Sequence, residues 1–146
     1  MKFKVPTLSR RKLLSLAAAV AIAGGTALPA TSASAATVAV YKLVTIDLVD
    51  EAIDGFETAL QAAYPDVTFE VFDAQGQANL YPTIARQIVR DDFDLIAVIG
   101  TPVVLATVDA AVEADSDVPI VFIAMGDPVG AGIANSLEEP GQQATG

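Results

Sequence analysis

The chain has 146 residues, a length typical of a single domain. It contains no cysteine and no histidine. Their absence excludes disulfides, cysteine nucleophiles, Ser-His-Asp triads and zinc sites built on Cys or His, and it removes the cysteine that an N-terminal lipoprotein anchor needs. Catalysis would have to rely on carboxylates, hydroxyls or Lys42. We therefore expect a protein that is not an enzyme and that uses no metal ion or other cofactor.

Charge is distributed unevenly along the chain. Five of the eight basic residues lie in the first twelve positions, whereas all 18 acidic residues follow position 46. Without its first 35 residues the chain keeps three basic residues and has a formal net charge of −15. Such a charge repels nucleic-acid phosphates and anionic lipids. We expect a solvated acidic surface and no nucleic-acid partner.

The first 35 residues have the organisation of a secretory signal peptide. A positively charged segment (1–12) precedes an apolar segment (13–28), and the small residues Ala33-Ser34-Ala35 follow. A signal peptidase recognises this order, and we expect cleavage between Ala35 and Ala36. A membrane-spanning helix is the alternative, but it needs about 20 apolar residues and this run is shorter. The predicted domains are a signal peptide (1–35) and an exported domain (36–146) without a lipid anchor.

The positively charged segment also contains a possible export motif. Residues 9–14, Ser-Arg-Arg-Lys-Leu-Leu, resemble the twin-arginine signal. The apolar segment that follows is rich in alanine and glycine and only mildly hydrophobic, which suits that route. Paired arginines also occur by chance in ordinary signals. We expect export through the twin-arginine route to the periplasm or the extracellular space.

The exported domain begins with a strand, a helix and a second strand. Residues 37–44 are rich in β-branched side chains and predict a strand. Asp47 can cap a following helix. The apolar residues of that helix recur at helical spacing: Val49, Ile53, Phe56 and Leu60. Residues 67–72 alternate imperfectly between apolar and polar side chains, which predicts an outer strand of a sheet.

The rest of the domain continues the alternation. Three apolar residues at helical spacing predict a second helix: Leu80, Ile84 and Ile88. Residues 94–99 and 118–124 are nearly continuous apolar runs, typical of strands buried on both faces. The alanine-rich segment 103–114 between them predicts a third helix. Four strands alternating with three helices predict an α/β fold of order βαβαβαβ, a parallel sheet flanked by helices.

Candidate ligand contacts lie in the loops after the strands. Parallel α/β sheets bind ligands outside the carboxyl ends of their strands. The loops expected at that edge span residues 45–47, 73–79, 100–103 and 125–130. The candidate contacts in these loops are Thr45, Asp47, Gln75, Asn79, Thr101, Pro102 and Asp127.

Several of these residues have a structural alternative. The Thr101 hydroxyl and the N–H groups of the following helix start could bind a carboxylate, or Thr101 could only cap the helix. Asp127 could accept a hydrogen bond from a ligand ammonium group, or it could hold its own loop. Asn79 could contact a ligand or cap the second helix.

A series of short motifs runs in order from about residue 38 to the end of the chain. The most specific are Pro-Ile-Val-Phe at 119–122 and Asp-Pro-Val-Gly-Ala-Gly at 127–132, which follow Thr101-Pro102. Ala74-Gln75-Gly76 and the final Thr145-Gly146 belong to the same series. Together these motifs resemble the ABC-transporter substrate-binding proteins of the tryptophan/tyrosine type, which are periplasmic-binding-protein-like.

The resemblance implies a two-lobed fold in which a small solute, often an aromatic amino acid, binds in the cleft between the lobes. The solute is then passed to a membrane permease driven by a separate ATPase. Members of the family are much longer, so this chain is expected to supply only the N-terminal lobe, with the second lobe absent. The loop 75–79 is also shorter than the family pattern.

Other functions stay open at this point. The same lobe could serve as the extracytoplasmic sensor of a signalling system, or the chain could be a non-functional truncated fragment. A hydrolase is the enzymatic alternative, but no nucleophile–base pair is visible without His or Cys. The expected function is binding of a small solute for uptake. The expected partners are the permease and its ATPase, with contact to the membrane only through the permease.

Overall fold

The computed structural model describes residues 35–138 and 144–146. The predicted twin-arginine motif and all of the predicted signal peptide before Ala35 lie outside the described residues. Within the described part of the chain, no helix is both long and apolar enough to cross a membrane.

The described strands form one parallel sheet in the order β2-β1-β3-β4-β5. Their bounds are β1 Thr37–Lys42, β2 Thr68–Asp73, β3 Leu95–Ile99, β4 Ile120–Ala124 and β5 Ala144–Thr145. β2 lies at one edge of the sheet, as predicted for the imperfectly alternating segment, and pairs with β1 from Thr37–Thr68 to Lys42–Asp73. The predicted parallel α/β sheet is therefore confirmed.

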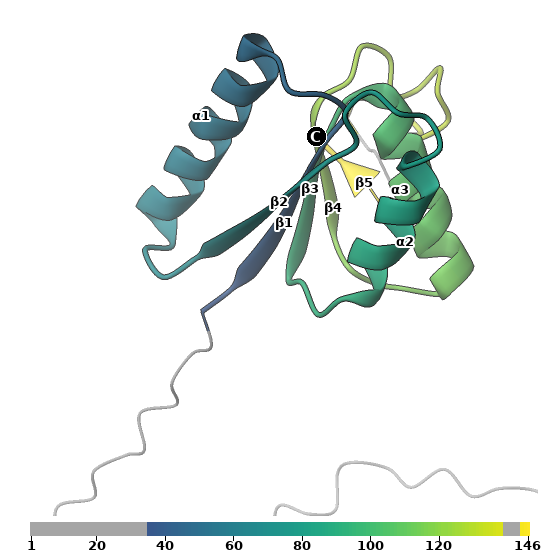
Figure 1. The fold of residues 1–146 in the computed structure, drawn as a ribbon. Helices are drawn as coiled ribbons and strands as arrows, with labels where there is room; N and C mark the ends of the chain where they lie inside the picture. The colour runs from purple at the N-terminus through teal and green to yellow at the C-terminus, as the bar shows by residue number, and fades with distance from the viewer. Residues whose placement is uncertain (1–34, 139–143) are drawn as a thin grey trace, which may run out of the picture. The chain divides into compact units, whose positions relative to one another are not determined.

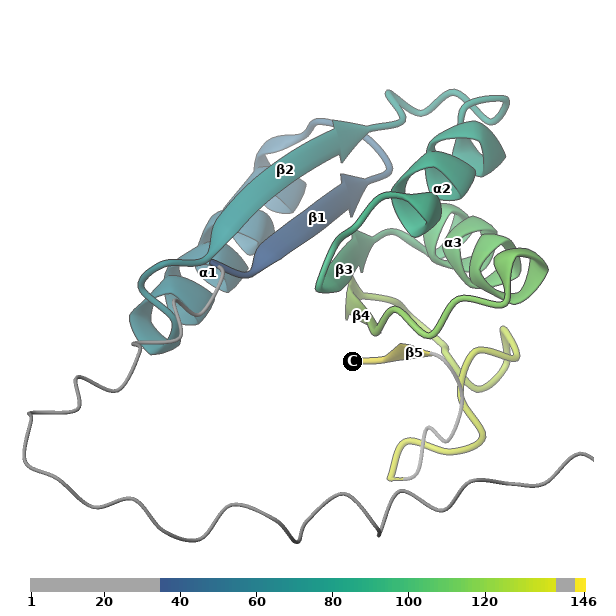
Figure 2. The same cartoon turned by 90° about the horizontal axis from the view of Figure 1, so that it is seen from below.

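Three helices cover the two faces of this sheet (Figures 1 and 2). α1 (Asp47–Ala63) packs on one face, and α2 (Tyr81–Arg90) and α3 (Thr101–Ala114) pack side by side on the other. The strand order explains this division. The chain moves outward from β1 to β2 and then crosses back over β1 to β3, and right-handed crossovers in opposite directions place their helices on opposite faces.

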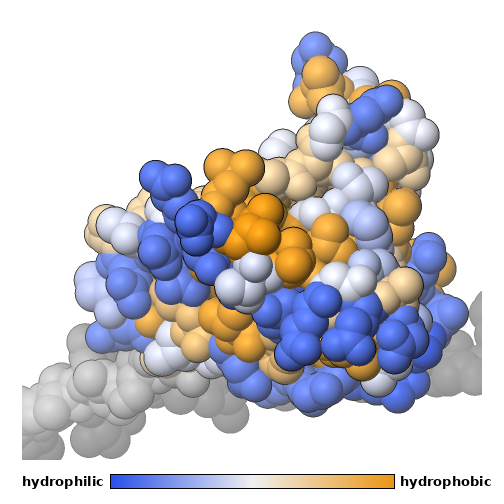
Figure 3. Space-filling view, turned by 45° about the horizontal axis from the view of Figure 1, so that its top comes forward, coloured by the Kyte–Doolittle hydropathy of each residue, from blue (hydrophilic) through white to orange (hydrophobic). Residues whose placement is uncertain are grey.

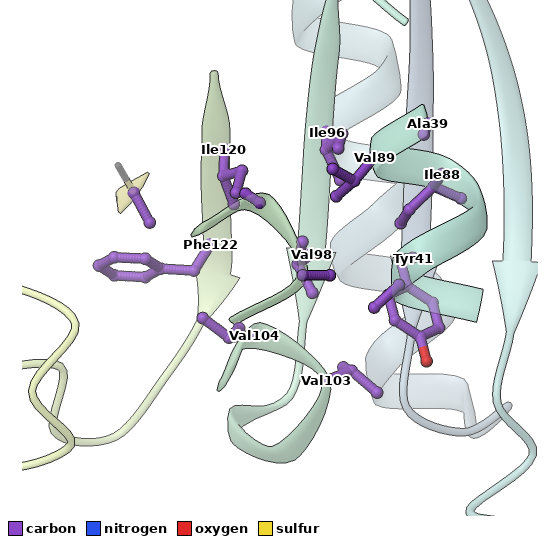
Figure 4. Packing of buried hydrophobic residues seen from close by; sticks show 14 of the residues in the cluster. Ala39, Tyr41, Ile88, Val89, Ile96, Val98, Val103, Val104, Ile120 and Phe122 are labelled. Atoms are coloured by element: carbon purple, nitrogen blue, oxygen red, sulfur yellow. The ribbon is translucent and has the colours of Figure 1, made fainter. Parts of the chain in front are cut away.

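The larger apolar core lies between the sheet and the α2–α3 pair (Figure 4). Tyr41, Val98 and Phe122 come from three neighbouring strands and belong to one cluster with Ile88 of α2 and Val104 of α3. The core on the α1 face is smaller, and its buried members are Val38, Val40, Ile53, Val67, Ala97 and Ile99. Alternate residues of β1 and β3 thus enter opposite cores, which is why β3 and the middle of β1 are continuously apolar.

The structure corrects three predicted helix starts. Asp47 does not cap α1, because the chain stays extended through Ile46 (φ −146°, ψ 152°), which takes the cap position without a side-chain hydrogen bond. Asn79 does not cap α2, since Leu80 occupies that position. α3 begins at Thr101 and not at 103, with Gly100 as its cap, so Thr101 and Pro102 belong to the first helical turn.

The two-residue strand β5 was not predicted. Ala144 pairs with Ile120 and Thr145 with Val121. A strand of two residues has too little pattern to be distinguished from a loop, and only its pairing with β4 defines it.

Candidate functional site

The loops after β1, β2 and β3 meet at the carboxyl edge of the sheet, toward the top of Figure 1. Backbone hydrogen bonds join them. The Leu43 N–H donates to the Ile99 carbonyl (3.1 Å), and the Gly76 N–H donates to the Leu43 carbonyl (2.8 Å). Since strand order changes direction between β1 and β3, this is the place where open α/β sheets bind ligands.

Asp73, the last residue of β2, connects two of the predicted contact residues. Its Oδ2 accepts a hydrogen bond from the Thr45 hydroxyl at 2.5 Å, and its Oδ1 accepts one from the Gln75 backbone N–H at 2.7 Å. We call Thr45, Asp73 and Gln75 the Asp73 cluster. The sequence predicted Thr45 and Gln75 as contacts but missed Asp73, although its place at the end of a strand was the available signal.

The charge state of Asp73 follows from these contacts. Burial acts to raise the pKa of its carboxyl group, but the hydrogen bonds from Thr45 and Gln75 and the nearby Lys42 charge outweigh burial and leave the pKa below its ordinary value. Asp73 is therefore ionised at neutral pH and acts only as a hydrogen-bond acceptor.

Gln75 and Gly76 form a left-handed turn at the tip of this loop. Their φ angles are 53° and 68°. Glycine adopts such angles freely, whereas a glutamine rarely does. The hydrogen bond from the Gln75 N–H to Asp73 helps to hold this conformation, and the Gln77 side chain donates to Gln75 Oε1 at 3.3 Å. Both glutamine side chains are exposed at the edge.

Lys42 places one positive charge near the Asp73 cluster. Its Nζ lies 2.7 Å from Asp50 Oδ1, and only 13% of its side chain is exposed. Lys42 thus forms a partly buried ion pair with α1 and is not presented to solvent as a free cation.

The start of α3 lies beside the loop that follows β1. Val103 and Val104 both donate backbone hydrogen bonds to the Gly100 carbonyl (3.2 and 3.1 Å), and Pro102 has no N–H. In this described first turn, Thr101 is left to offer its N–H and hydroxyl to a ligand. Thr101 is half-buried and Pro102 is exposed.

The remaining candidate contacts lie outside the Asp73 cluster. Asp127 holds its own loop, since its Oδ1 accepts a hydrogen bond from the Gly130 N–H at 2.7 Å. Asp47 and Asn79 are exposed. No hydrogen bond recorded among the described residues links Asp47, Asn79 or Asp127 to the Asp73 cluster, and no described group of acidic residues could hold a metal ion.

Apolar surface lies next to these polar groups. Ile46, the cap residue of α1, and Leu48, in the first turn of α1, are 50% and 73% exposed. Figure 3, which brings the top of Figure 1 forward, shows apolar and hydrophilic residues side by side on this face. An edge of this kind can bind a small molecule that has both apolar and polar parts.

Comparison with known proteins identifies the family. The family described as ABC transporter substrate binding protein matches residues 37–146. The chain belongs to this family. The resemblance to this family that the loop motifs indicated is therefore confirmed.

Other substrate-binding proteins show the extent of the match. A tyrosine-binding protein from Clostridioides difficile (strain R20291) is 38% identical over 113 residues, which cover 75% of this chain and 32% of the relative. This chain therefore spans about a third of the length of that curated relative.

Two solved structures have the same fold. An ABC domain from Streptococcus pneumoniae in complex with L-Trp has a TM-score of 0.67 and 26% identity, and covers 77% of this chain and 38% of its own. A conserved domain protein from Vibrio cholerae O1 biovar El Tor has a TM-score of 0.66 and 37% identity, and covers 76% of this chain and 38% of its own.

Proposed function

We propose that this chain is the N-terminal lobe of an extracytoplasmic solute-binding protein that serves an ABC uptake transporter. The proposed ligand is an aromatic amino acid, bound in a cleft between this lobe and a second one. The proposed partners are the membrane permease and its ATPase, which receive the ligand after the lobes close. Family membership and the two relatives named for tyrosine and L-Trp support the proposal.

The observation that carries the proposal is the position of the Asp73 cluster. Polar groups that can orient a ligand lie at the carboxyl edge of the sheet, where the loops after β1 and β2 meet next to the β1–β3 switch in strand order. The exposed side chains of Ile46, just before α1, and of Leu48, in its first turn, follow Thr45 closely in the chain. The proposed contacts are the candidate residues Thr45, Asp47, Gln75, Asn79, Thr101, Pro102 and Asp127.

Calorimetry on the full-length protein tests the ligand. We expect saturable binding of L-tyrosine or L-tryptophan and none of L-glutamate or L-lysine. Replacing Thr101 with alanine should weaken binding roughly tenfold or more, because a hydrogen bond to a charged ligand group is lost. Thr68→Ala, at the amino end of β2 and away from the carboxyl edge, is the matched control and should bind as the wild type does. Absence of binding for every aromatic amino acid would contradict the proposal.

We also propose export by the twin-arginine route with cleavage between Ala35 and Ala36. Replacing both Arg10 and Arg11 with lysine keeps the charge and removes the motif. The doubly substituted precursor should then stay in the cytoplasm, as fractionation and immunoblotting would show. Lys12→Arg is the control and should be exported normally. Unimpaired export of the double variant would contradict this route.

A further inference from the structure

The hydrogen bond between Thr45 and Asp73 has a fixed direction. An ionised carboxylate can only accept hydrogen bonds, and a threonine hydroxyl has one proton to donate. Because Thr45 Oγ1 lies 2.5 Å from Asp73 Oδ2, the proton of Thr45 is committed to Asp73. The exposed hydroxyl oxygen of Thr45 can therefore offer a ligand only its lone pairs, as an acceptor.

The charges around Thr45 and Asp73 favour a ligand group that is positively charged and donates hydrogen bonds. Lys42 supplies one positive charge, whereas Asp50 and Asp73 supply two negative ones, and Lys42 is held against Asp50 at 2.7 Å. Asp47, the exposed first residue of α1, adds a further carboxylate two residues after Thr45. The part of the carboxyl edge around Thr45 and Asp73, called this corner below, thus has an excess of negative charge and accepts hydrogen bonds.

We propose that Asp73 is a positioning residue that makes Thr45 an acceptor, so that this corner selects the ammonium group of the ligand. The inference rests on the proposed function and adds the orientation of the amino acid to it. Asp73 acts through Thr45 and through the Gln75 turn, whose backbone it also holds.

One substitution reverses the hydrogen bond while it keeps the size of the side chain. In Asp73→Asn, the amide oxygen can still accept from the Gln75 N–H, but the amide NH₂ now faces Thr45 and donates to it. The Thr45 proton is then released toward the ligand. A ligand group that donates a hydrogen bond to Thr45 should therefore bind the variant less tightly, whereas a ligand group that accepts one should not.

The test compares ligands with and without the ammonium group on the full-length protein. The pairs are L-tyrosine with 3-(4-hydroxyphenyl)propionate and L-tryptophan with indole-3-propionate. We expect the wild type to prefer the amino acid by roughly tenfold or more, the effect of one charge-assisted hydrogen bond. In Asp73→Asn we expect this preference to disappear, with the affinity for the propionates kept. Thr45→Val should lose the preference as well, and Thr45→Ser should keep it.

The controls separate the inference from the proposed function. Asp66→Asn makes the same change of charge just before β2, at the amino ends of the strands, and should keep the preference for the amino acid. Equal loss of affinity for both members of a pair in Asp73→Asn would show a merely structural role and would overturn this inference without touching the proposed function. A preference for the amino acid that is unchanged in Asp73→Asn would also overturn it. If the wild type binds neither amino acid, the proposed function fails and this inference fails with it.

Discussion

Gly100 and Leu43 approach each other so closely that only glycine fits at position 100. A Cβ atom placed on Gly100 would lie 2.8 Å from the Leu43 Cβ, and Gly100 has a φ angle of 108°. Through this contact the start of α3 packs directly against the loop that follows β1. The contact therefore fixes the spacing between Thr101 and the loop that carries Thr45.

We expect Gly100→Ala to lower the free energy of unfolding by about 2–4 kcal/mol, because both the backbone angle and the contact with Leu43 become strained. Urea denaturation would measure the change. Gly55→Ala is the matched control, since its added Cβ meets nothing within 4 Å in the middle of α1. That control should stabilise the protein by about 0.5–1 kcal/mol. Equal effects at the two positions would contradict the prediction.

Tyr41 should contribute stability that is lost at alkaline pH. Burial, with smaller effects of Tyr81 and Asp73, raises the pKa of Tyr41 to about 12. Because an unfolded tyrosine ionises near pH 10, the contribution is complete below about pH 10 and falls as the pH rises through 12.

The comparison of Tyr41→Phe with the wild type checks this expectation. The variant loses the hydrogen bond from the Tyr41 hydroxyl to the Tyr81 carbonyl (3.1 Å) but cannot ionise. It should be less stable by about 1 kcal/mol at neutral pH. The difference should shrink between about pH 10 and pH 12, as urea denaturation at a series of pH values would show. Tyr64, which is 63% exposed, supplies the control Tyr64→Phe, expected to change little.

Asp73 should have the opposite pH dependence. Its folded pKa is lowered, so its contribution to stability is present above the unfolded pKa of about 4 and is lost as the pH falls through the folded value. The groups that face it are Thr45, the Gln75 N–H and Lys42. Asp73→Asn should therefore flatten the acid side of the stability profile, measured by thermal unfolding from neutral to acid pH. An acid side as steep as in the wild type would show that other carboxylates determine it.

The two described ion pairs should differ in strength. Lys42–Asp50 is short at 2.7 Å and partly buried, whereas Arg86–Glu113 spans 3.8 Å with side chains 44% and 65% exposed. In double-mutant cycles, we expect a coupling of about 0.5–1 kcal/mol for Lys42–Asp50 and near zero for Arg86–Glu113. A stronger coupling for the exposed pair would contradict this order. The value for Lys42–Asp50 should fall in high salt.

The main elements of the fold could be predicted because each has a pattern of its own. The apolar runs of β3 and β4 and the helical spacing in α1 are visible in short windows of sequence. The start of α3 was misplaced because proline is equally suited to a turn and to the first helical turn. Asp47 looks like a cap, but the extended conformation of Ile46 decided where α1 begins.

The geometry of the Asp73 cluster could be predicted only in part. Parallel strands bring their following loops to one edge, so Thr45 and Gln75 could be placed there before the structure was known. The bond that Asp73 makes to both depends on β2 lying next to β1 and on the left-handed turn at Gln75. Neither property is encoded in a short motif.

The unequal covering of the two sheet faces has a consequence for how ligand binding can be detected. Among the described elements, α1 alone packs on its face, over the smaller core, and Thr45 belongs to the loop that leads into it. An element with fewer buried contacts opens at lower free energy, and its amides exchange with deuterium sooner. A molecule that contacts Thr45 would therefore slow deuterium uptake along the whole of α1. Residues near Ala63, at the far end of that helix, would report occupancy of a site that they do not touch.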